Sequence, residues 1–168
     1  MGEYGEKWGM DLSGEFPKVI LDEKNRITLP ADLRKELDGS SIKISKGEDK
    51  CLKIYPLSKW EEMIGEEIKA NTVPFVKRDR RLLRKYGAAR TEKIDNAGRI
   101  LIPDSLCEYA GLKKDCVILG QFNYIELWDK IRYENYSNED NEENAIEFEA
   151  ASEDLGRIIK RKKGIIET

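Results

Sequence analysis

The amino-acid sequence predicts an α+β fold built from two copies of one small module. The first observation is a repeated stretch, because residues 22–30 (DEKNRITLP) return 73 residues later as 95–103 (DNAGRILIP). The second is that apolar positions beyond this stretch, such as Leu33 and Leu106, keep the same spacing. The third is that alternating apolar runs flank a short helical pattern in each copy. A spacing held across strands, a turn and a helix indicates an internal duplication.

Each copy begins with a pattern typical of two strands joined by a tight turn. In the first copy an apolar run ends at Leu21, and Ile27 and Leu29 alternate with polar residues after the turn. Asn25 tolerates a left-handed backbone better than most non-glycine residues, and Gly98 holds the equivalent place in the second copy. We therefore expect a positive φ angle at both positions.

A short helix and two more strands complete each copy. Pro30 and Pro103 suit a first helical turn, and Gly39 and Gly111 are expected to end the two helices. The later apolar runs are 42–44 and 51–55 in the first copy, and 117–119 and 124–128 in the second. Because each copy has only about forty residues, near the lower limit for independent folding, we expect the copies to share a core, the protein to oligomerise, or both.

The 168-residue chain also divides by composition. The expected segments are a flexible extension 1–13, a first domain 14–58, a helical linker with a basic run 59–87, a second domain 88–131, and a C-terminal helix with a charged tail 132–168. Within the tail, 137–151 is strongly acidic and 157–163 is basic. Blocks of like charge with low hydrophobicity predict weak order there.

Charge is unevenly distributed along the chain. The net charge is only −3 although 38% of the residues are charged, which argues against polyanion binding by total charge alone. Between Lys77 and Arg90, however, seven Lys or Arg accompany a single acid, a local charge of +6. A one-signed basic segment is what counterion release from DNA requires, whereas the ordinary alternative is a solvated helix face. The candidate contacts with DNA or another subunit are Arg78, Arg81, Arg84 and Lys85.

Several function classes lack the residues that they need. The three cysteines form no CxxC pair, and the chain has no histidine, so a zinc site is not expected. No glycine-rich phosphate loop or catalytic constellation is present in the sequence, so we expect no enzyme, no cofactor and no small-molecule substrate. Free thiols suit a reducing cytoplasm, and no apolar run in the sequence is long enough to span a membrane.

The repeated turn is the strongest candidate for binding. An Asp precedes an Arg by four residues in both copies, as Asp22 with Arg26 and Asp95 with Arg99. A hairpin Arg presents a planar set of donors that suits a phosphate or the O6/N7 edge of guanine, while the Asp can close the turn. The alternative is two ordinary hairpin salt bridges. Two matches at a fixed spacing are far more specific than one.

These residues resemble the MraZ family, bacterial transcriptional regulators built from two SpoVT-AbrB domains. The resemblance covers about residues 14–128 and rests on 21–30 (LDEKNRITLP), 52–56 (LKIYP) with Trp60, 95–100 (DNAGRI) and, most specifically, 120–129 (GQFNYIELWD). The arginine-rich linker is also similar to the central helix of the family. The sequence departs from the family pattern at Asn25, which stands where glycine is usual.

The resemblance implies a tandem AbrB-type swapped-hairpin β-barrel formed by the two repeats, with flanking helices, and a ring-like homo-oligomer. It also implies a cytoplasmic, nucleoid-associated protein, usually a repressor, that binds double-stranded DNA at short direct repeats upstream of the division and cell-wall gene cluster. The implied DNA contacts are Arg26, Arg99 and Lys24, and the implied turn-structuring residues are Asp22, Asn25, Asp95 and Gly98. Lys24 and Asn25 favour the first turn as the reader of bases.

A hypothesis from a different class is a protein-binding module such as an antitoxin. Its motivation is the acidic stretch 137–151, which would wrap a basic partner. Loss of a co-purifying partner on deletion of the tail, with DNA binding intact, would distinguish this class from a DNA-binding regulator.

Overall fold

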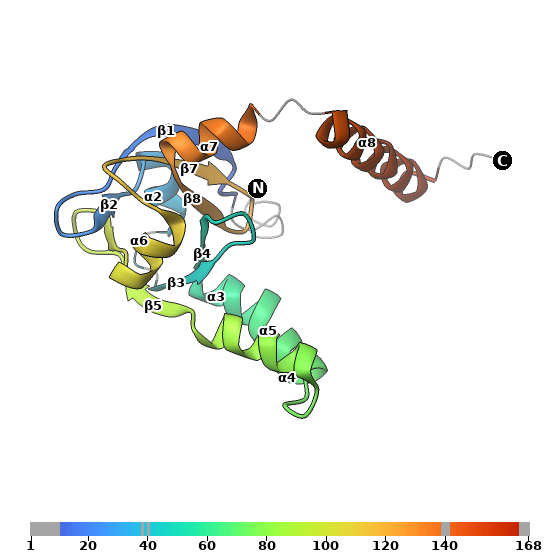
Figure 1. Ribbon diagram of the computed structural model, residues 1–168, viewed down its shortest axis with the longest axis horizontal. Helices are drawn as coiled ribbons and strands as arrows, with labels where there is room; N and C mark the ends of the chain where they lie inside the picture. The colour runs from blue at the N-terminus through green and yellow to red at the C-terminus, as the bar shows by residue number, and fades with distance from the viewer. Residues whose placement is uncertain (1–10, 38, 40, 139–141, 165–168) are drawn as a thin grey trace, which may run out of the picture. The chain divides into compact units, whose positions relative to one another are not determined.

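The computed structural model describes residues 11–164, apart from 38, 40 and 139–141. The chain divides into two compact units, residues 1–133 and 134–168. The first unit contains both sequence repeats, and the second contains the C-terminal helix, labelled α8 in Figure 1. Among the described residues, no helix has the length and apolar character needed to cross a membrane.

The first unit follows the order of elements that the duplication predicts. The first repeat contains β1 (Gly14–Ile20), β2 (Arg26–Thr28), α2 (Ala31–Leu37), β3 (Ser41–Lys46) and β4 (Leu52–Pro56). The second contains β5 (Arg90–Lys93), β6 (Arg99–Leu101), α6 (Asp104–Ala110), β7 (Asp115–Gly120) and β8 (Ile125–Asp129). Between the repeats lie α3 (Leu57–Trp60), a π-helical turn η1 (Glu61–Gly65), α4 (Glu66–Asn71) and α5 (Lys77–Gly87). After β8, α7 (Lys130–Ser137) begins in the first unit and ends in the second. The α+β class with tandem repeats is confirmed.

Strands of one repeat pair mainly with strands of the other. The larger sheet is antiparallel in the order β1-β7-β8-β4-β3-β5, and β2 and β6 form a separate two-stranded ribbon. The pairings are symmetric between the repeats. If each strand is replaced by its equivalent in the other repeat, the β1–β7 pair becomes the β5–β3 pair, which is also present. The described strands leave β1 and β5 at the ends of the larger sheet, so their hydrogen bonds do not close one continuous barrel.

The strand registers locate a pseudo-twofold axis between the repeats. In the ribbon, Ile27 stands opposite Ile100, and in the larger sheet Lys53 stands opposite Glu126. The members of each pair occupy equivalent places in the two copies, because both pairs are 73 residues apart. Ile27 and Ile100 are fully buried in a core cluster to which both repeats contribute. The expected shared core is therefore confirmed.

The core extends to residues before the first strand. Residues 1–13 were expected to be flexible; 1–10 lie outside the described residues, but Leu12 is fully buried. Its backbone N–H donates to the Phe122 carbonyl oxygen over 2.9 Å. A Cβ on Gly120 would lie 1.7 Å from the Leu12 carbonyl oxygen, so this close approach of two backbones requires glycine.

An aromatic cluster attaches the linker helices to the sheet. The Trp60 ring lies edge-on to Tyr55 and to Tyr86, with centroids 5.3 and 5.8 Å apart, and Tyr55 stacks on Tyr124 at 4.9 Å. Because such pairs stabilise beyond their buried area, this cluster connects α3 and α5 to β4 and the loop before β8. The basic run thus forms the expected helix, with its apolar side half-buried.

In the second unit, α8 (Glu142–Lys162) is a helix of 21 residues, contrary to the weak order expected from its charge blocks. Acidic residues in its first half and basic residues in its second half complement the helix dipole. Arg157 also pairs with Glu153 and Asp154, at 3.7 and 3.4 Å. The like-charge blocks are therefore compatible with helix because they occupy opposite ends.

Candidate nucleic-acid interface

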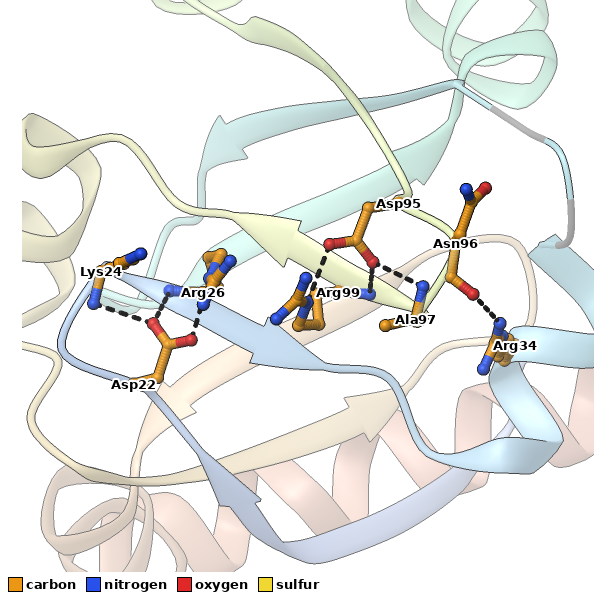
Figure 2. Close-up of polar contacts among 8 residues, drawn as sticks. All are labelled: Asp22, Lys24, Arg26, Arg34, Asp95, Asn96, Ala97 and Arg99. Carbon is orange, nitrogen blue, oxygen red and sulfur yellow. Dashed lines mark hydrogen bonds and ion pairs between the residues drawn. The ribbon is translucent and has the colours of Figure 1, made fainter.

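The first turn is organised by the Asp22 carboxylate. Its Oδ1 accepts the backbone N–H groups of Lys24 (2.9 Å) and Arg26 (2.8 Å), and its Oδ2 accepts Arg26 Nε at 2.9 Å (Figure 2). Asn25 adopts the expected left-handed conformation, with φ of 59°. Hydrogen bonds from Arg26, above all from its backbone, hold the pKa of Asp22 below its usual value, so the carboxylate stays charged in the folded turn.

The second turn repeats this arrangement. Asp95 Oδ1 accepts the backbone N–H groups of Ala97 and Arg99, each at 2.9 Å, and Oδ2 accepts Arg99 Nε at 2.8 Å. Gly98 has φ of 77°, again as expected. The Arg99 backbone is the main cause that lowers the pKa of Asp95. The two turns are therefore chemically equivalent in their Asp and Arg, and the salt bridges of the alternative interpretation are present.

The ribbon brings the two arginines to one face. Arg26 stands opposite Leu101, and Thr28 stands opposite Arg99. Because side chains alternate along a strand and Ile27 and its partner point into the core, these four lie together on the other face. Figure 2 shows both Asp–Arg pairs on these neighbouring strands. Their side chains remain accessible, at 27% for Arg26 and 38% for Arg99.

Each guanidinium is held by one edge and open at the other. Nε of both arginines donates to an aspartate, as described above. Among the described residues no hydrogen bond uses the Nη groups of Arg26 or Arg99, so these donors remain for a ligand. A planar set of donors on an exposed face suits phosphate or a guanine edge.

Each turn is also supported by a helix of the opposite repeat. Arg34 of α2 donates through Nη2 to the Asn96 carbonyl oxygen at 2.6 Å, and a Cβ on Gly98 would lie 2.8 Å from Arg34 Cδ. In the other direction, the Asn25 side-chain amide donates to the Asp104 carboxylate at the start of α6. These two hydrogen bonds could not be predicted by comparing the repeats. The positions equivalent to Arg34 and Asp104, 73 residues away, hold a cysteine and an alanine. The only sequence signal was an acid directly after Pro103.

The basic residues of α5 lie elsewhere on the first unit. Figure 1 shows α5 beside α3 and α4, away from β2. Arg78 Nε pairs with buried Asp79 at 3.1 Å, and Lys85 pairs with Glu48 at 3.1 Å. Arg81 and Arg84 are exposed. Arg78 is itself 80% exposed despite its ion pair, so Lys85 alone of the four candidates is partly buried, and the structure does not bring them to the turns.

In the part of the chain that the structure describes, no three Cys, Asp or Glu side chains gather in a way that could hold a metal ion. Two of the three cysteines are shielded from reagents, whereas Cys107 is only partly buried. Cys51 and Cys116 are fully buried, and burial raises the pKa of each thiol to about 12.

The chain matches a known protein family twice. The family is described as "MraZ protein, putative antitoxin-like", and the matches cover residues 14–85 and 86–157. Among curated relatives named Transcriptional regulator MraZ, that of Treponema denticola is 41% identical over 148 residues, 88% of this chain and 99% of that protein. That of Acetivibrio thermocellus is 40% identical over 131 residues, 76% and 87% of the two chains. That of Clostridium beijerinckii is 42% identical over 148 residues, 86% and 96%.

The family matches fall on the same duplication that the structure displays. Each match begins at the first strand of one repeat or just before it, and together they cover the two turns, the ribbon and the shared core. The relatives are aligned over most of their own length. The chain belongs to the MraZ family.

Proposed function

We propose that this chain is a sequence-specific, DNA-binding transcriptional regulator whose DNA-contacting surface is the outer face of the β2–β6 ribbon. One observation carries the proposal: Arg26 and Arg99, each braced by an aspartate, share that exposed face at pseudo-symmetric positions. The names of the relatives support a role in transcription.

The ribbon has the form that such binding needs. The major groove of B-DNA admits a two-stranded β-ribbon, and Arg pairs there with the O6 and N7 atoms of guanine. Because Nε of each Arg is already bonded to Asp, the side chain is ordered before DNA arrives, which lowers the entropy cost of binding. Ile27 and Ile100 anchor the opposite face of the ribbon in the core.

The two turns are proposed to contribute differently. Lys24 adds a positive charge to the first turn, where the second has Ala97. Arg26 also stands beside an exposed apolar side chain, Leu101, whereas Arg99 stands beside Thr28. Base edges offer both hydrogen-bond acceptors and apolar methyl groups, while phosphates offer acceptors alone. We therefore assign base reading to the first turn and phosphate binding to the second.

One ribbon makes few contacts, so useful affinity requires several ribbons acting together. We propose a ring-like homo-oligomer that binds short direct repeats in the promoter of the division and cell-wall gene cluster, as a repressor. In this proposal Arg78, Arg81, Arg84 and Lys85 contact flanking phosphates or neighbouring subunits. The two SpoVT-AbrB domains are 14–58 and 88–131, joined by the helical linker 59–87, and the protein acts without catalysis in the cytoplasm at the nucleoid.

Titration of fluorescent DNA from upstream of this protein's own gene tests the proposal, at several salt concentrations. Binding should weaken steeply as salt rises, because released counterions contribute to affinity. Arg26→Ala should cost roughly 1–3 kcal/mol per engaged site and relax preference for one base pair. Arg99→Ala should weaken specific and unrelated DNA alike and lower the salt slope by about 1 per engaged site.

A matched control is Lys69→Ala, which removes one exposed positive charge from α4, outside the ribbon. Its affinity should equal that of the unchanged chain. Circular dichroism of each variant should verify that the fold is retained. Unchanged affinity after combined Arg26→Ala and Arg99→Ala substitution, in a folded protein, would reject the assignment of this face.

A further inference from the structure

Helix α8 carries an apolar face that lies open to solvent. Its apolar side chains recur at spacings of three and four residues: Phe148, Ala151, Leu155, Ile158 and Ile159. Phe148 is 75% exposed and Leu155 is 57% exposed. In proteins most of the stability of a helix comes from packing such an apolar face against a neighbour rather than from helix propensity. The stripe from Phe148 to Ile159 therefore needs a partner.

The charges of α8 indicate which partner fits. Its described acidic side chains all precede Leu155 and its basic side chains all follow that residue: Glu147, Glu149, Glu153 and Asp154, then Arg157, Lys160, Arg161 and Lys162. Two such helices side by side in parallel would place like charges together. In antiparallel orientation, each acidic half lies along the basic half of the other helix. A second copy of α8 is thus complementary to the first in charge as well as in apolar surface.

We propose that α8 pairs with α8 of a second copy of this chain, in antiparallel orientation, burying the Phe148–Ile159 stripe. Leu155 then lies near the centre of the pair, and the Phe148 end of one helix lies beside the Lys162 end of the other. The contact is made by the second unit alone, so it does not depend on the DNA-binding function proposed above. It supplies a link between chains through a helix that carries no part of the ribbon.

Isotope-mixed cross-linking of the full-length chain tests the pairing. Unlabelled and ¹⁵N-labelled chains are mixed, treated with a zero-length carbodiimide that joins carboxylates to lysines, and analysed by mass spectrometry. Glu147 and Lys162 lie 15 residues apart on one helix, about 22 Å, so a direct bond between them must join two helices. The pairing predicts mixed-isotope links from Glu147 or Glu149 to Lys162 or Lys163.

Two variants test whether the pairing depends on the apolar stripe itself or on any exposed apolar residue of α8. Phe148→Ala with Leu155→Ala removes two apolar side chains from the stripe but keeps good helix-forming residues, so α8 itself should persist. Losing that burial should lower the yield of mixed-isotope links about tenfold or more. The matched control is Ile146→Ala, since this exposed residue lies on the opposite side of the helix from Leu155, and its link yield should be unchanged.

Three results would overturn the proposal. One is the absence of mixed-isotope links between two α8 segments. Another is that α8 lysines link solely to carboxylates of residues 11–133, which would make the first unit the partner. The third is an equal link yield in the double variant and the unchanged chain, with helicity by circular dichroism retained in both.

Discussion

Arg34 of α2 donates through Nη2 to the carbonyl oxygen of Asn96, 2.6 Å away, and so joins a helix of the first repeat to the turn of the second. The reciprocal support is a hydrogen bond from the Asn25 side chain to the Asp104 carboxylate. The pseudo-symmetry of the backbone places a helix beside each turn, but the bonds themselves differ. The two arginine-bearing turns can therefore be disturbed one at a time.

Arg34→Met should loosen the second turn without unfolding the protein. The substitution removes one hydrogen bond to the Asn96 carbonyl, which is worth about 1 kcal/mol, and keeps most of the side-chain bulk against Gly98. Amide hydrogen exchange should speed up at Ala97 and Arg99 and stay constant at Lys24. Lys35→Met is the control, because it removes the same charge from an exposed neighbour on α2. If the Arg34 variant accelerated exchange equally at both turns, the two turns would not be supported independently.

Gly98→Ala should destabilise the fold. Its φ of 77° costs an L-residue about 1–2 kcal/mol, and the new Cβ would lie 2.8 Å from Arg34 Cδ. The midpoint of urea unfolding should therefore fall. Gly87→Ala provides the comparison, since a Cβ there meets nothing within 4 Å and no positive φ is involved. That variant should be neutral or slightly more stable.

The same measurement in a double variant separates backbone strain from crowding. Arg34→Ala removes the atoms that would crowd the new methyl group. If crowding contributes, the loss caused by Gly98→Ala should be smaller in the Arg34→Ala background, because the two positions are in contact. An identical loss in both backgrounds would attribute the whole effect to the φ angle.

The repeat made much of the fold predictable, because apolar alternation, Pro30 with Pro103, and a left-handed turn at Asn25 and Gly98 each recur. Pairing between repeats was less accessible, since local patterns say nothing about which strand lies beside which. The Asp–Arg brace was predicted because it lies within five consecutive residues. Arg34 was not, because its partner is 62 residues away and is a backbone oxygen that every residue type supplies.

In the C-terminal tail, amino-acid composition alone gave a wrong prediction of local order. Acidic and basic blocks predicted weak order, yet the blocks lie at opposite ends of α8, where they favour the helix dipole. Leu12 is a similar case, since it belongs to a segment whose glycines and mixed charges predicted flexibility, yet it fills the core beside Gly120. In both cases position in three dimensions outweighed average composition.

The buried thiols should react slowly in the folded protein. Burial raises the pKa of Cys51 and Cys116 to about 12, so these thiols stay almost wholly protonated at pH 8, and only the thiolate attacks a disulfide reagent. Cys51 Sγ also donates to Glu126 Oε2 at 3.4 Å. With Ellman's reagent, Cys107 should react before the other two, because it is only partly buried. Full denaturation should release all three at once, and rapid modification of native Cys51 would contradict this order.

Acid should weaken the attachment of α5 to the sheet through one carboxylate. Glu48 accepts Lys53 Nζ at 2.6 Å and Lys85 Nζ at 3.1 Å. Burial alone would raise the pKa of Glu48, but the hydrogen bonds from the two lysines lower it to about 2. Because this pKa is below the unfolded value of about 4.3, the stabilisation is complete above that value and is lost as the pH falls toward 2.

Glu48→Gln should therefore remove part of the acid dependence. The variant should be less stable than the unchanged chain at pH 6, by at most about 1 kcal/mol because the pair is partly exposed, and the difference should shrink as the pH falls from about 4.3 to 2. Urea unfolding followed by tryptophan fluorescence, to which Trp60 beside Tyr86 of α5 contributes, measures the stability difference at each pH. Glu66→Gln on α4 is the control, since this exposed acid has no such bridge among the described residues and should leave the pH dependence unchanged. A stability difference for Glu48→Gln that stayed constant from pH 6 to pH 2 would show that the bridge does not hold α5 in place.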